Sequence, residues 1–469
     1  MQASNKQVSE GMNQKGIGRR TVQYFKGYMP FYKRNLRLAF PVMMTQLGSA
    51  LVGFLDTVMV GHYGTTELAA VSFSNSFYLM VMVFTMGLVM SVTPLVGTAF
   101  VQKKEDEVAN LLHNGLVFTF IITIAACALL LACVPLLGYM GQEPEVIEKA
   151  VPYFVTITIS LFPFIFFQFF KQFFEGIGNT MAAMCIMLST NLLNILLNYL
   201  LIFGKWGFPE WGALGAGVAS LIARILMPIL FLAVFACRKE WSGYLRSFRW
   251  KNIHTSVMRQ LAALGLPIGT QTLLETIAFA GSYIIVGWLS KEAMAAHQIG
   301  NQIANLTFML AVGIGAATTV RVSHQYGLRD YKAVRMAANA SIHLCLLMNA
   351  IGATLMISCR KIIPLAFTND PAVIEIASSL LIFAGLFQLS DGLQCVGIAM
   401  LRGIQDVRRP ALYAFIAYIL LELPIGYILM FPCGLGTNGM WIGFIIGLSV
   451  AAVLFHTRFR SQFRKIANS

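Results

Sequence analysis

The segment Glu143-Pro144-Glu145-Val146-Ile147-Glu148 recurs 227 residues later as Asp370-Pro371-Ala372-Val373-Ile374-Glu375. Farther along, Phe174-Glu175-Gly176-Ile177 matches Leu401-Arg402-Gly403-Ile404 at the same offset. The earlier parts of the two halves match at an offset of 226: Glu67-Leu68-Ala69-Ala70 with Ala293-Met294-Ala295-Ala296, and Gly61, Asn75, Gly87 and Thr93 with Gly287, Asn301, Gly313 and Thr319. Because loops match as well as apolar segments, the two halves of the chain are repeats of each other.

The repeated unit is apolar. Of 469 residues, 57% are hydrophobic and 12% are charged, whereas about 25% of the residues of a soluble domain are charged. This composition excludes a soluble enzyme, a disordered protein and a disulfide scaffold. A helix needs about 20 apolar residues to cross a bilayer. Twelve segments are long enough: 38–62, 67–100, 109–138, 146–172, 180–204, 211–237, 258–289, 293–322, 333–358, 372–401, 409–431 and 437–457.

Six spans in each copy is an even number, so the two copies share one orientation in the membrane. The sequence therefore predicts an all-α membrane protein with twelve transmembrane helices, arranged as two pseudo-symmetric six-helix bundles in a parallel repeat around a central cleft. A monomer is sufficient for such a body. The expected parts are a basic cytoplasmic N-terminal arm (1–37), an N-lobe (38–237), a cytoplasmic linker (238–257), a C-lobe (258–457) and a basic cytoplasmic tail (458–469).

The basic residues lie mainly on one side of the predicted spans. The net charge is +14, and 28 of the 34 Lys and Arg residues lie in the N-terminal arm, the even-numbered loops or the tail. The odd-numbered loops hold five, and Arg224 lies inside the sixth span. This asymmetry predicts that both termini are cytoplasmic. It also explains the positive charge without a nucleic-acid partner, so the expected surroundings are the lipid bilayer.

Sequence signatures of ATP binding and metal hydrolysis are missing. The chain has no GxxxxGK[ST] and no HExxH, and none of its eight cysteines forms a CxxC pair. The glycine-rich segment 212–217 opens a span and has the wrong spacing for a dinucleotide turn, so it indicates close helix packing. We therefore expect no catalytic residues and no cofactor: the protein is not an enzyme, and any work it does draws on an ion gradient.

Two acids lie near the middle of predicted spans in the C-lobe. Glu275 shares a helical face with Gln271, and Asp391 shares one with Gln388 and Gln394. Such polar stripes on apolar helices are expected to face a wet cavity. The two carboxylates suit Na⁺, a proton or a cationic substrate, because charged groups at membrane depth are costly unless they serve a function. The alternative is a satisfied structural hydrogen bond.

The N-lobe has a different polar set. Asn191, Asn194 and Asn198 lie on one face of the fifth span, and Asp56 lies in the first span at the same predicted depth as Asn198. Carboxylate and amide oxygens suit a hard monovalent cation such as Na⁺. We therefore expect Asp56, Asn194 and Asn198 to form a second cation site. The alternative is helix packing through amide side chains.

Two further charged residues are interpreted as structural. Arg224 is expected to pair with an acid or to extend toward the membrane surface. Glu422 precedes Pro424 and is expected to satisfy backbone groups that the proline kink frees. Aromatic residues make up 12% of the chain, which also has 24 Met. A minority of these suit the lining of a cleft for flat organic cations.

These features together resemble the multidrug and toxic compound extrusion (MATE) family, most closely its NorM-type bacterial branch. The resemblance extends from about Leu36 to Arg458. It rests on Leu55-Asp56-Thr57-Val58-Met59-Val60-Gly61, the asparagine-rich fifth span, Glu275, and Asp391-Gly392-Leu393-Gln394 followed by Leu401-Arg402-Gly403. Related sequences often have a second acid where this chain has Asn198, and their loop after the tenth span commonly has Gly and Thr where this chain has Gln405 and Val407.

The resemblance implies a multi-pass protein of the bacterial inner membrane that exchanges cationic, often aromatic, compounds for Na⁺ or H⁺ by alternating access. By match of motif, Glu275 and Asp391 correspond to the carboxylates of the C-lobe. Asp56, Asn194 and Asn198 correspond to the cation site of the N-lobe.

Two alternatives remain open at this point. A flippase for a lipid-linked saccharide has a related architecture but needs a basic cavity for pyrophosphate, and this cleft is expected to be acidic apart from Arg224. A membrane-embedded enzyme acting on lipid needs His with Asp or Ser clustered near an interface, which the sequence does not offer.

Overall fold

The structure is a computed structural model that describes residues 2–237, 243 and 253–468, with side chains described over 25–237, 243 and 253–466. Most of the expected linker, the side chains of the first 24 residues and the end of the tail therefore lie outside the described residues.

The described chain is helical, and no strand occurs in it. Twelve of its helical segments are long and apolar enough to cross a membrane, which confirms the predicted fold class. The elements are α1 (Gln2–Tyr63), α2 (Thr65–Val89), α3 (Val92–Val101), α4 (Glu105–Ala132), α5 (Val134–Leu137), α6 (Pro144–Gly176), α7 (Met181–Ile202), α8 (Gly212–Cys237), α10 (Thr255–Gly287), α11 (Lys291–Gly327), α12 (Tyr331–Ser358), α13 (Pro371–Gly403), α14 (Arg408–Ala414), α15 (Leu423–Met430) and α16 (Thr437–Asn468). Short 3₁₀ turns cover Lys205–Gly207 and Ile363–Ala366, and a π-helix covers Phe415–Glu422.

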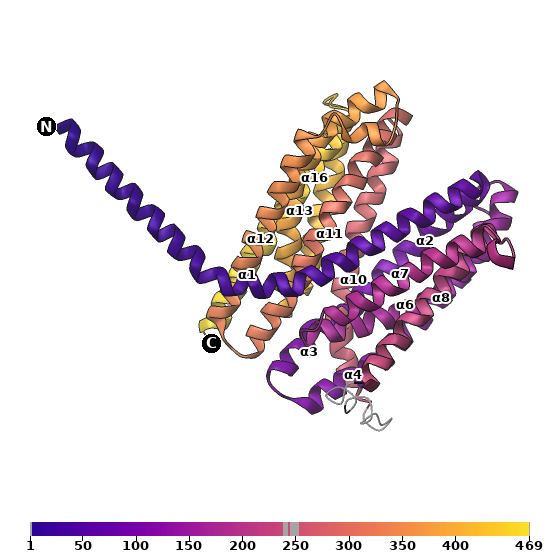
Figure 1. Ribbon diagram of the computed structural model, residues 1–469, viewed down its shortest axis with the longest axis horizontal. Coiled ribbons are helices and arrows are strands. Elements are labelled where there is room, and N and C mark those ends of the chain that lie inside the picture. The colour runs from indigo at the N-terminus through magenta and orange to yellow at the C-terminus, as the bar shows by residue number, and fades with distance from the viewer. Residues whose placement is uncertain (1, 238–242, 244–252, 469) are drawn as a thin grey trace.

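The first helix is longer than the predicted first span. Helix α1 runs without interruption from Gln2, and its part long and apolar enough to cross a membrane begins at Phe25. Its N-terminal part extends away from the other helices, and the rest runs between the two groups of helices (Figure 1). Pro30 and Pro41 lie inside the helix, and proline removes one backbone hydrogen bond and tends to bend a helix.

Two other spans are interrupted. The second consists of α2 and α3, which are separated at Met90 and Ser91. The eleventh begins as α14, continues as the π-helix and ends as α15, with Pro424 in the first turn of α15. A π-helix is rare and often marks a functional site.

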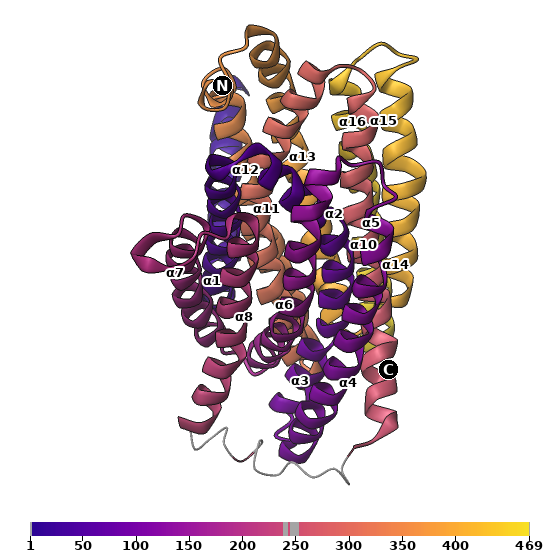
Figure 2. The same cartoon turned by 90° about the vertical axis from the view of Figure 1, so that its right-hand side faces the viewer.

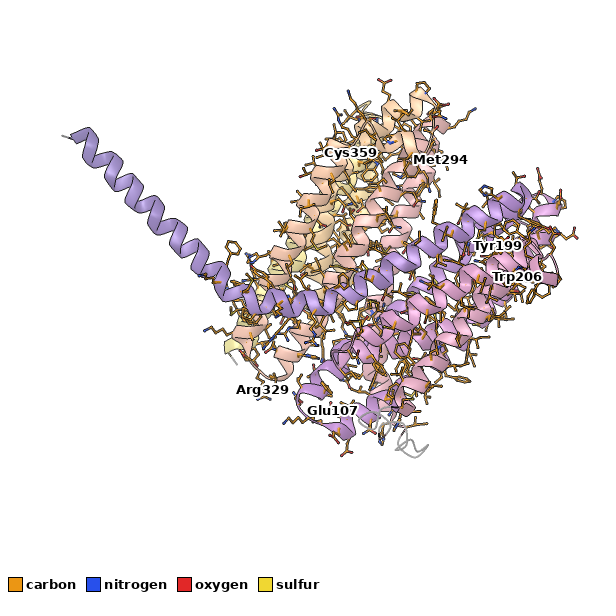
Figure 3. The ribbon with its side chains drawn as sticks, in the orientation of Figure 1. Glu107, Tyr199, Trp206, Met294, Arg329 and Cys359 are labelled. Carbon is orange, nitrogen blue, oxygen red and sulfur yellow. The ribbon has the colours of Figure 1, made fainter. Side chains whose placement is uncertain are left out.

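The helices form two groups that diverge toward one end (Figure 1). In Figure 2, α6 and α8 of one group lie in front of α11 and α13 of the other. We call α1–α8 the N-lobe and α10–α16 the C-lobe. At the diverging end lie Tyr199 and Trp206 of the N-lobe and Met294 and Cys359 of the C-lobe, whereas Glu107 and Arg329 lie at the other end (Figure 3). The diverging end carries the odd-numbered loops, and the opposite end carries the even-numbered loops.

The contacts between the lobes repeat as the sequence does. A Cβ atom built on Gly87 of α2 would lie 2.4 Å from Gly269 Cα of α10, and one built on Gly313 of α11 would lie 2.4 Å from Met43 Cγ of α1. Gly87 and Gly313 are repeat equivalents, as are Met43 and Gly269. Each lobe therefore presents its first helix to the second span of the other lobe, which is the arrangement that a parallel repeat about one axis produces.

Hydrogen bonds join the lobes at the even-loop end. His324 Nε2 of α11 lies 2.7 Å from the carbonyl oxygen of Gly176 at the end of α6. Gln102 Nε2 donates to the carbonyl oxygen of Gly327 at 2.9 Å, and Gln405 Nε2 donates to Thr98 Oγ1 at 3.3 Å. The lobes are thus held together by hydrogen bonds at the even-loop end and are separated at the odd-loop end.

Candidate functional site

A cavity of about 810 Å³ lies between the lobes. Its wall is formed by α1, α2, α3 and α6 of the N-lobe and α10, α11 and α13 of the C-lobe. Toward the even-loop end it reaches Met90, Thr93 and Thr319, next to the contacts that fasten the lobes. This cavity is the central cleft that the repeat predicted.

Glu275 and Asp391 both line the cavity, on α10 and α13, and Gln394 joins them. The Gln394 amide nitrogen donates to Glu275 Oε1 at 3.0 Å and to Asp391 Oδ1 at 3.2 Å. Its amide oxygen accepts a hydrogen bond of 2.8 Å from the hydroxyl of Tyr418, which fixes the orientation of the amide. The three side chains predicted from the polar stripes thus form one hydrogen-bonded unit, to which the structure adds Tyr418.

The two remaining glutamines of the predicted stripes differ in position. Gln271 lines the cavity and accepts a hydrogen bond from Arg402. Gln388 lies off the cavity wall: its side-chain amide donates to the carbonyl oxygen of Ala304 on α11 at 3.1 Å. The expectation that the whole stripe faces the cavity is therefore wrong at Gln388, because the tight packing of α13 on α11 covers that position.

The N-lobe set also comes together. Asn198 Nδ2 donates to Asp56 Oδ1 at 2.5 Å and to Asn194 Oδ1 at 3.2 Å, and Asn194 contacts Ser220 Oγ at 3.4 Å. Asp56 and Asn198 therefore meet, as their depths in the sequence predicted. The Asn198 oxygen is buried and has no hydrogen-bond partner within the described residues. None of these residues lines the central cavity, so the cluster is a separate polar site inside the N-lobe.

The environment of Arg224 differs from the predicted ion pair. Its guanidinium donates to the Tyr78 hydroxyl at 2.5 Å and to Ser160 Oγ at 2.7 Å, and it lies over the ring of Phe164. Within the described residues it forms no ion pair with an acid, and it does not line the cavity. The expectation of Arg224 as the basic exception in the cleft is therefore wrong.

The cavity wall carries other charges instead. Lys171 and Glu175 of α6 and Arg402 of α13 all line it, near the even-loop end. Lys171 Nζ lies 3.8 Å from Glu175 Oε1. The expectation of a cleft that is acidic apart from Arg224 is therefore wrong. Lys171 and Arg402 lie at the ends of predicted spans and had been assigned to the even-numbered loops, but both line the cavity. The spacing of four residues between Lys171 and Glu175 was the one signal in the sequence for their pairing.

Glu422 ends the π-helix and is buried, with 1% of its surface exposed. Its Oε2 atom has no hydrogen-bond partner within the described residues. Contrary to the prediction from the sequence, this oxygen does not satisfy the backbone that Pro424 frees. Over the described part of the chain, no group of three or more His, Cys, Asp or Glu side chains is arranged to hold a metal ion.

Comparison with known proteins identifies the family. The family model MatE matches residues 41–200 and 267–428. The multidrug resistance protein NorM of Photobacterium profundum is 33% identical over 437 residues, which cover 92% of this chain and 96% of that protein. The multidrug resistance protein MdtK of Photorhabdus laumondii is 32% identical over 438 residues, covering 92% and 95%.

Solved structures share the fold. An outward-facing conformation of a multidrug resistance MATE family transporter of the MOP superfamily has a TM-score of 0.85 at 21% identity, covering 94% of this chain and 97% of that one. The eukaryotic MATE transporter AtDTX14 has a TM-score of 0.83 at 21% identity, covering 94% and 99%. Together with the family match over both repeats, the relatives identify this chain as a member of the MatE family.

Proposed function

We propose that the protein is a secondary active multidrug efflux transporter that exchanges cationic, aromatic compounds for Na⁺ or H⁺ by alternating access. The observation that carries the proposal is the pair of carboxylates, Glu275 and Asp391, on the wall of a cavity between two lobes that are fastened at only one end. The names of the relatives, NorM and MdtK multidrug resistance proteins, support the same function.

The coupling follows from competition for one set of negative charges. A drug cation in the cavity is stabilised by Glu275 and Asp391. Na⁺ or H⁺ bound at the same carboxylates removes that stabilisation and releases the drug. The ion-loaded carrier then opens to the opposite side and exchanges its ion for another drug molecule. One charge moving through 100 mV supplies about 2.3 kcal/mol, which sustains a concentration ratio of roughly fifty-fold.

The N-lobe cluster provides a second place for the coupling ion. Asp56 supplies a carboxylate, and Asn194 and Asn198 supply amide oxygens. These are the oxygen ligands that hard cations prefer. Because this cluster lies away from the cavity wall, an ion bound there acts on the drug site through the packing of α1 and α7, not through direct competition.

The orientation in the membrane follows from the charge asymmetry. Basic residues are concentrated at the even-loop end, which supports a cytoplasmic position for that end and for both termini in a protein of the bacterial inner membrane. The cavity then faces outward. Each lobe supplies part of the cavity within one chain, so a monomer completes the site.

The flippase alternative receives little support from the cavity. A pyrophosphate group needs several cations, but Lys171 is paired with Glu175, which leaves a single guanidinium, that of Arg402, without an acidic partner within the described residues. The carboxylates of Glu275 and Asp391 on the same wall would repel a phosphate.

The test is ethidium efflux from cells that produce the protein, with Na⁺ present or replaced by choline at fixed pH. We expect Glu275→Gln and Asp391→Asn each to abolish cation-dependent efflux. Glu67→Gln is the matched control, because Glu67 pairs with Lys149 at 3.4 Å and lies off the cavity wall. Full, cation-dependent efflux by both cavity variants would overturn the proposal.

The same assay separates the coupling ions. Efflux that collapses in choline identifies Na⁺ as the coupling ion. Efflux that persists in choline but stops when the pH gradient is dissipated identifies H⁺. No efflux under either condition would favour the flippase.

A further inference from the structure

We propose that the junction of α1, α11 and α12 binds the phosphate group of an anionic phospholipid, with Arg321 and Arg34 as its ligands. The junction lies toward the even-loop end, and Arg321 does not line the central cavity. The proposal therefore concerns a second site, which does not depend on the drug-efflux function. It starts from the guanidinium of Arg321, which is buried without an acceptor within the described residues.

Arg321 lies on α11, six residues before this helix ends at Gly327, and has 8% of its surface exposed. Its Nε and Nη2 atoms are buried and make no hydrogen bond within the described residues. None of the ion pairs in the same part of the chain includes it. A buried charge is costly unless it is paired and hydrogen-bonded. An anion bound to Arg321 would meet both requirements.

The charged neighbours of Arg321 are themselves bases. Arg34 of α1 is exposed and lies within electrostatic range of Arg321. His324, about one turn farther along α11, is also within range, and its ring is held 2.7 Å from the carbonyl oxygen of Gly176. Like charges repel each other, so an anion placed between Arg34 and Arg321 is stabilised by both.

Helix geometry places the Arg321 side chain in the groove between α1 and α12. A Cβ atom built on Gly313 of α11 would lie 2.4 Å from Met43 Cγ of α1. Thr307, also on α11, meets Gly352 of α12, where a Cβ atom would lie 3.2 Å from Thr307 Cγ2. At about 100° per residue, Thr307 points about 120° from Gly313 around the helix axis, and Arg321 points about 80° from it in the same sense. Arg321 thus points between the two neighbouring helices.

Asn35 fixes α1 onto α12 beside this groove. Its Nδ2 atom donates to Ser341 Oγ at 2.9 Å and to the carbonyl oxygen of Ala337 at 3.2 Å. Because Asn35 directly follows Arg34, these bonds hold the backbone of Arg34 beside α12. The groove therefore has fixed walls and two guanidinium groups, one buried and one exposed.

The surroundings of the groove favour a lipid as the source of the phosphate. Arg321 lies about 9 Å along α11 from the last residue of the helix, and the loop that follows holds Arg329 at the even-loop end (Figure 3). On α1, Leu36 and Phe40 expose 40% and 55% of their surface, which suits contact with acyl chains. A guanidinium binds phosphate through two parallel hydrogen bonds, and basic pockets between transmembrane helices bind anionic headgroups.

The test counts lipids bound to the purified full-length protein by native mass spectrometry. Dioleoylphosphatidylglycerol is anionic. Dioleoylphosphatidylcholine has the same phosphate and acyl chains but adds a cation, which Arg34 and Arg321 repel. We expect Arg321→Gln to weaken binding of the first phosphatidylglycerol molecule by about tenfold and Arg34→Gln by about threefold, with phosphatidylcholine binding unchanged in both.

Three controls accompany these variants. Arg409→Gln removes an exposed arginine from α14, which packs on α10 and α16, and should change phosphatidylglycerol binding by less than about twofold. Arg321→Lys keeps the charge but loses the planar fork, so we expect an intermediate loss. The melting temperature of each variant shows whether it is folded. If Arg321→Gln does not fold, Arg34→Gln tests the site at an exposed position.

Equal losses of phosphatidylglycerol in Arg321→Gln, Arg34→Gln and Arg409→Gln would indicate general attraction to a basic surface and would overturn the site. Unchanged binding in Arg34→Gln and in any folded Arg321 variant would also overturn it. Inorganic phosphate should not displace the first phosphatidylglycerol molecule, and displacement would assign the groove to free phosphate in place of a lipid. Each of these results leaves the efflux function standing, because ethidium efflux is measured separately.

Discussion

Gly97 and Ser323 are repeat equivalents, and they contact each other: a Cβ atom built on Gly97 would lie 2.5 Å from Ser323 Oγ. Two positions that are equivalent in a two-fold repeat meet only where the axis passes between them. The pseudo-symmetry axis therefore runs through the even-loop end of the molecule, between α3 and α11.

The closeness of this contact predicts an effect of side-chain size. Gly97→Leu should lower the melting temperature of the detergent-solubilised protein, with a destabilisation of about 1–3 kcal/mol typical of overpacking, because the larger side chain meets Ser323 and the α6 terminus. Gly53→Leu is the control, since a Cβ at Gly53 has no atom within 4 Å. Equal melting temperatures for the two variants would show that the lobes are not in tight contact here.

The hydrogen bonds of Gln394 predict that it acts with the two carboxylates. Gln394→Leu leaves Glu275 and Asp391 without their shared donor, so we expect cation-driven efflux to fall by about tenfold, the effect of losing one or two hydrogen bonds to charged groups. Gln388→Leu on the same helix is the matched control and should keep its ion dependence, because Gln388 contacts backbone off the cavity wall. A wild-type ion response in Gln394→Leu would remove this residue from the site.

The N-lobe cluster predicts a difference between two asparagines on one helix. Asn198→Leu removes the donor to Asp56 and an amide oxygen, and we expect a several-fold lower efflux rate with a weaker dependence on the coupling ion. Asn191→Leu should have a smaller effect, because the Asn191 amide nitrogen makes no hydrogen bond within the described residues. Titrating Na⁺ and pH against the initial efflux rate measures both variants. Identical curves for the two would argue against an ion at Asp56.

The partners of Arg224 predict a role in stability, not in binding. Arg224→Met breaks the hydrogen bonds to Tyr78 and Ser160 and leaves a buried hydroxyl pair without its donor, which should cost about 1–3 kcal/mol. We expect a lower melting temperature and an unchanged dissociation constant for ethidium, since Arg224 does not line the cavity. Tyr78→Phe should give a smaller loss of the same kind. A large change in ethidium affinity with normal stability would reverse this assignment.

Several features of the site followed from one-dimensional patterns. The spacing of Gln394 from Asp391 places both on one helical face, and counting residues from the membrane surface brings Asp56 and Asn198 to one depth. Such reasoning predicts a contact where both residues lie on the same helix, or where a shared depth in the membrane limits which residues can meet. The reasoning fails for Gln388 on α13. The face of α13 that lines the cavity is narrower than the polar stripe, and α11 covers the part of the stripe that holds Gln388.

Chain length, apolar composition and the internal repeat by themselves determined the twelve spans, the two six-helix lobes and the cleft between them, because backbone groups in a bilayer must pair within helices and a repeated unit packs as its copy does. Only the tertiary structure decided that Arg402 and Lys171 belong to the cavity, that Arg224 binds Tyr78 and Ser160, and that Tyr418 orients Gln394. These contacts join different helices, in some cases residues more than a hundred positions apart. Which residues meet depends on the rotation of each helix about its own axis. That rotation is fixed by packing against all neighbouring helices at once.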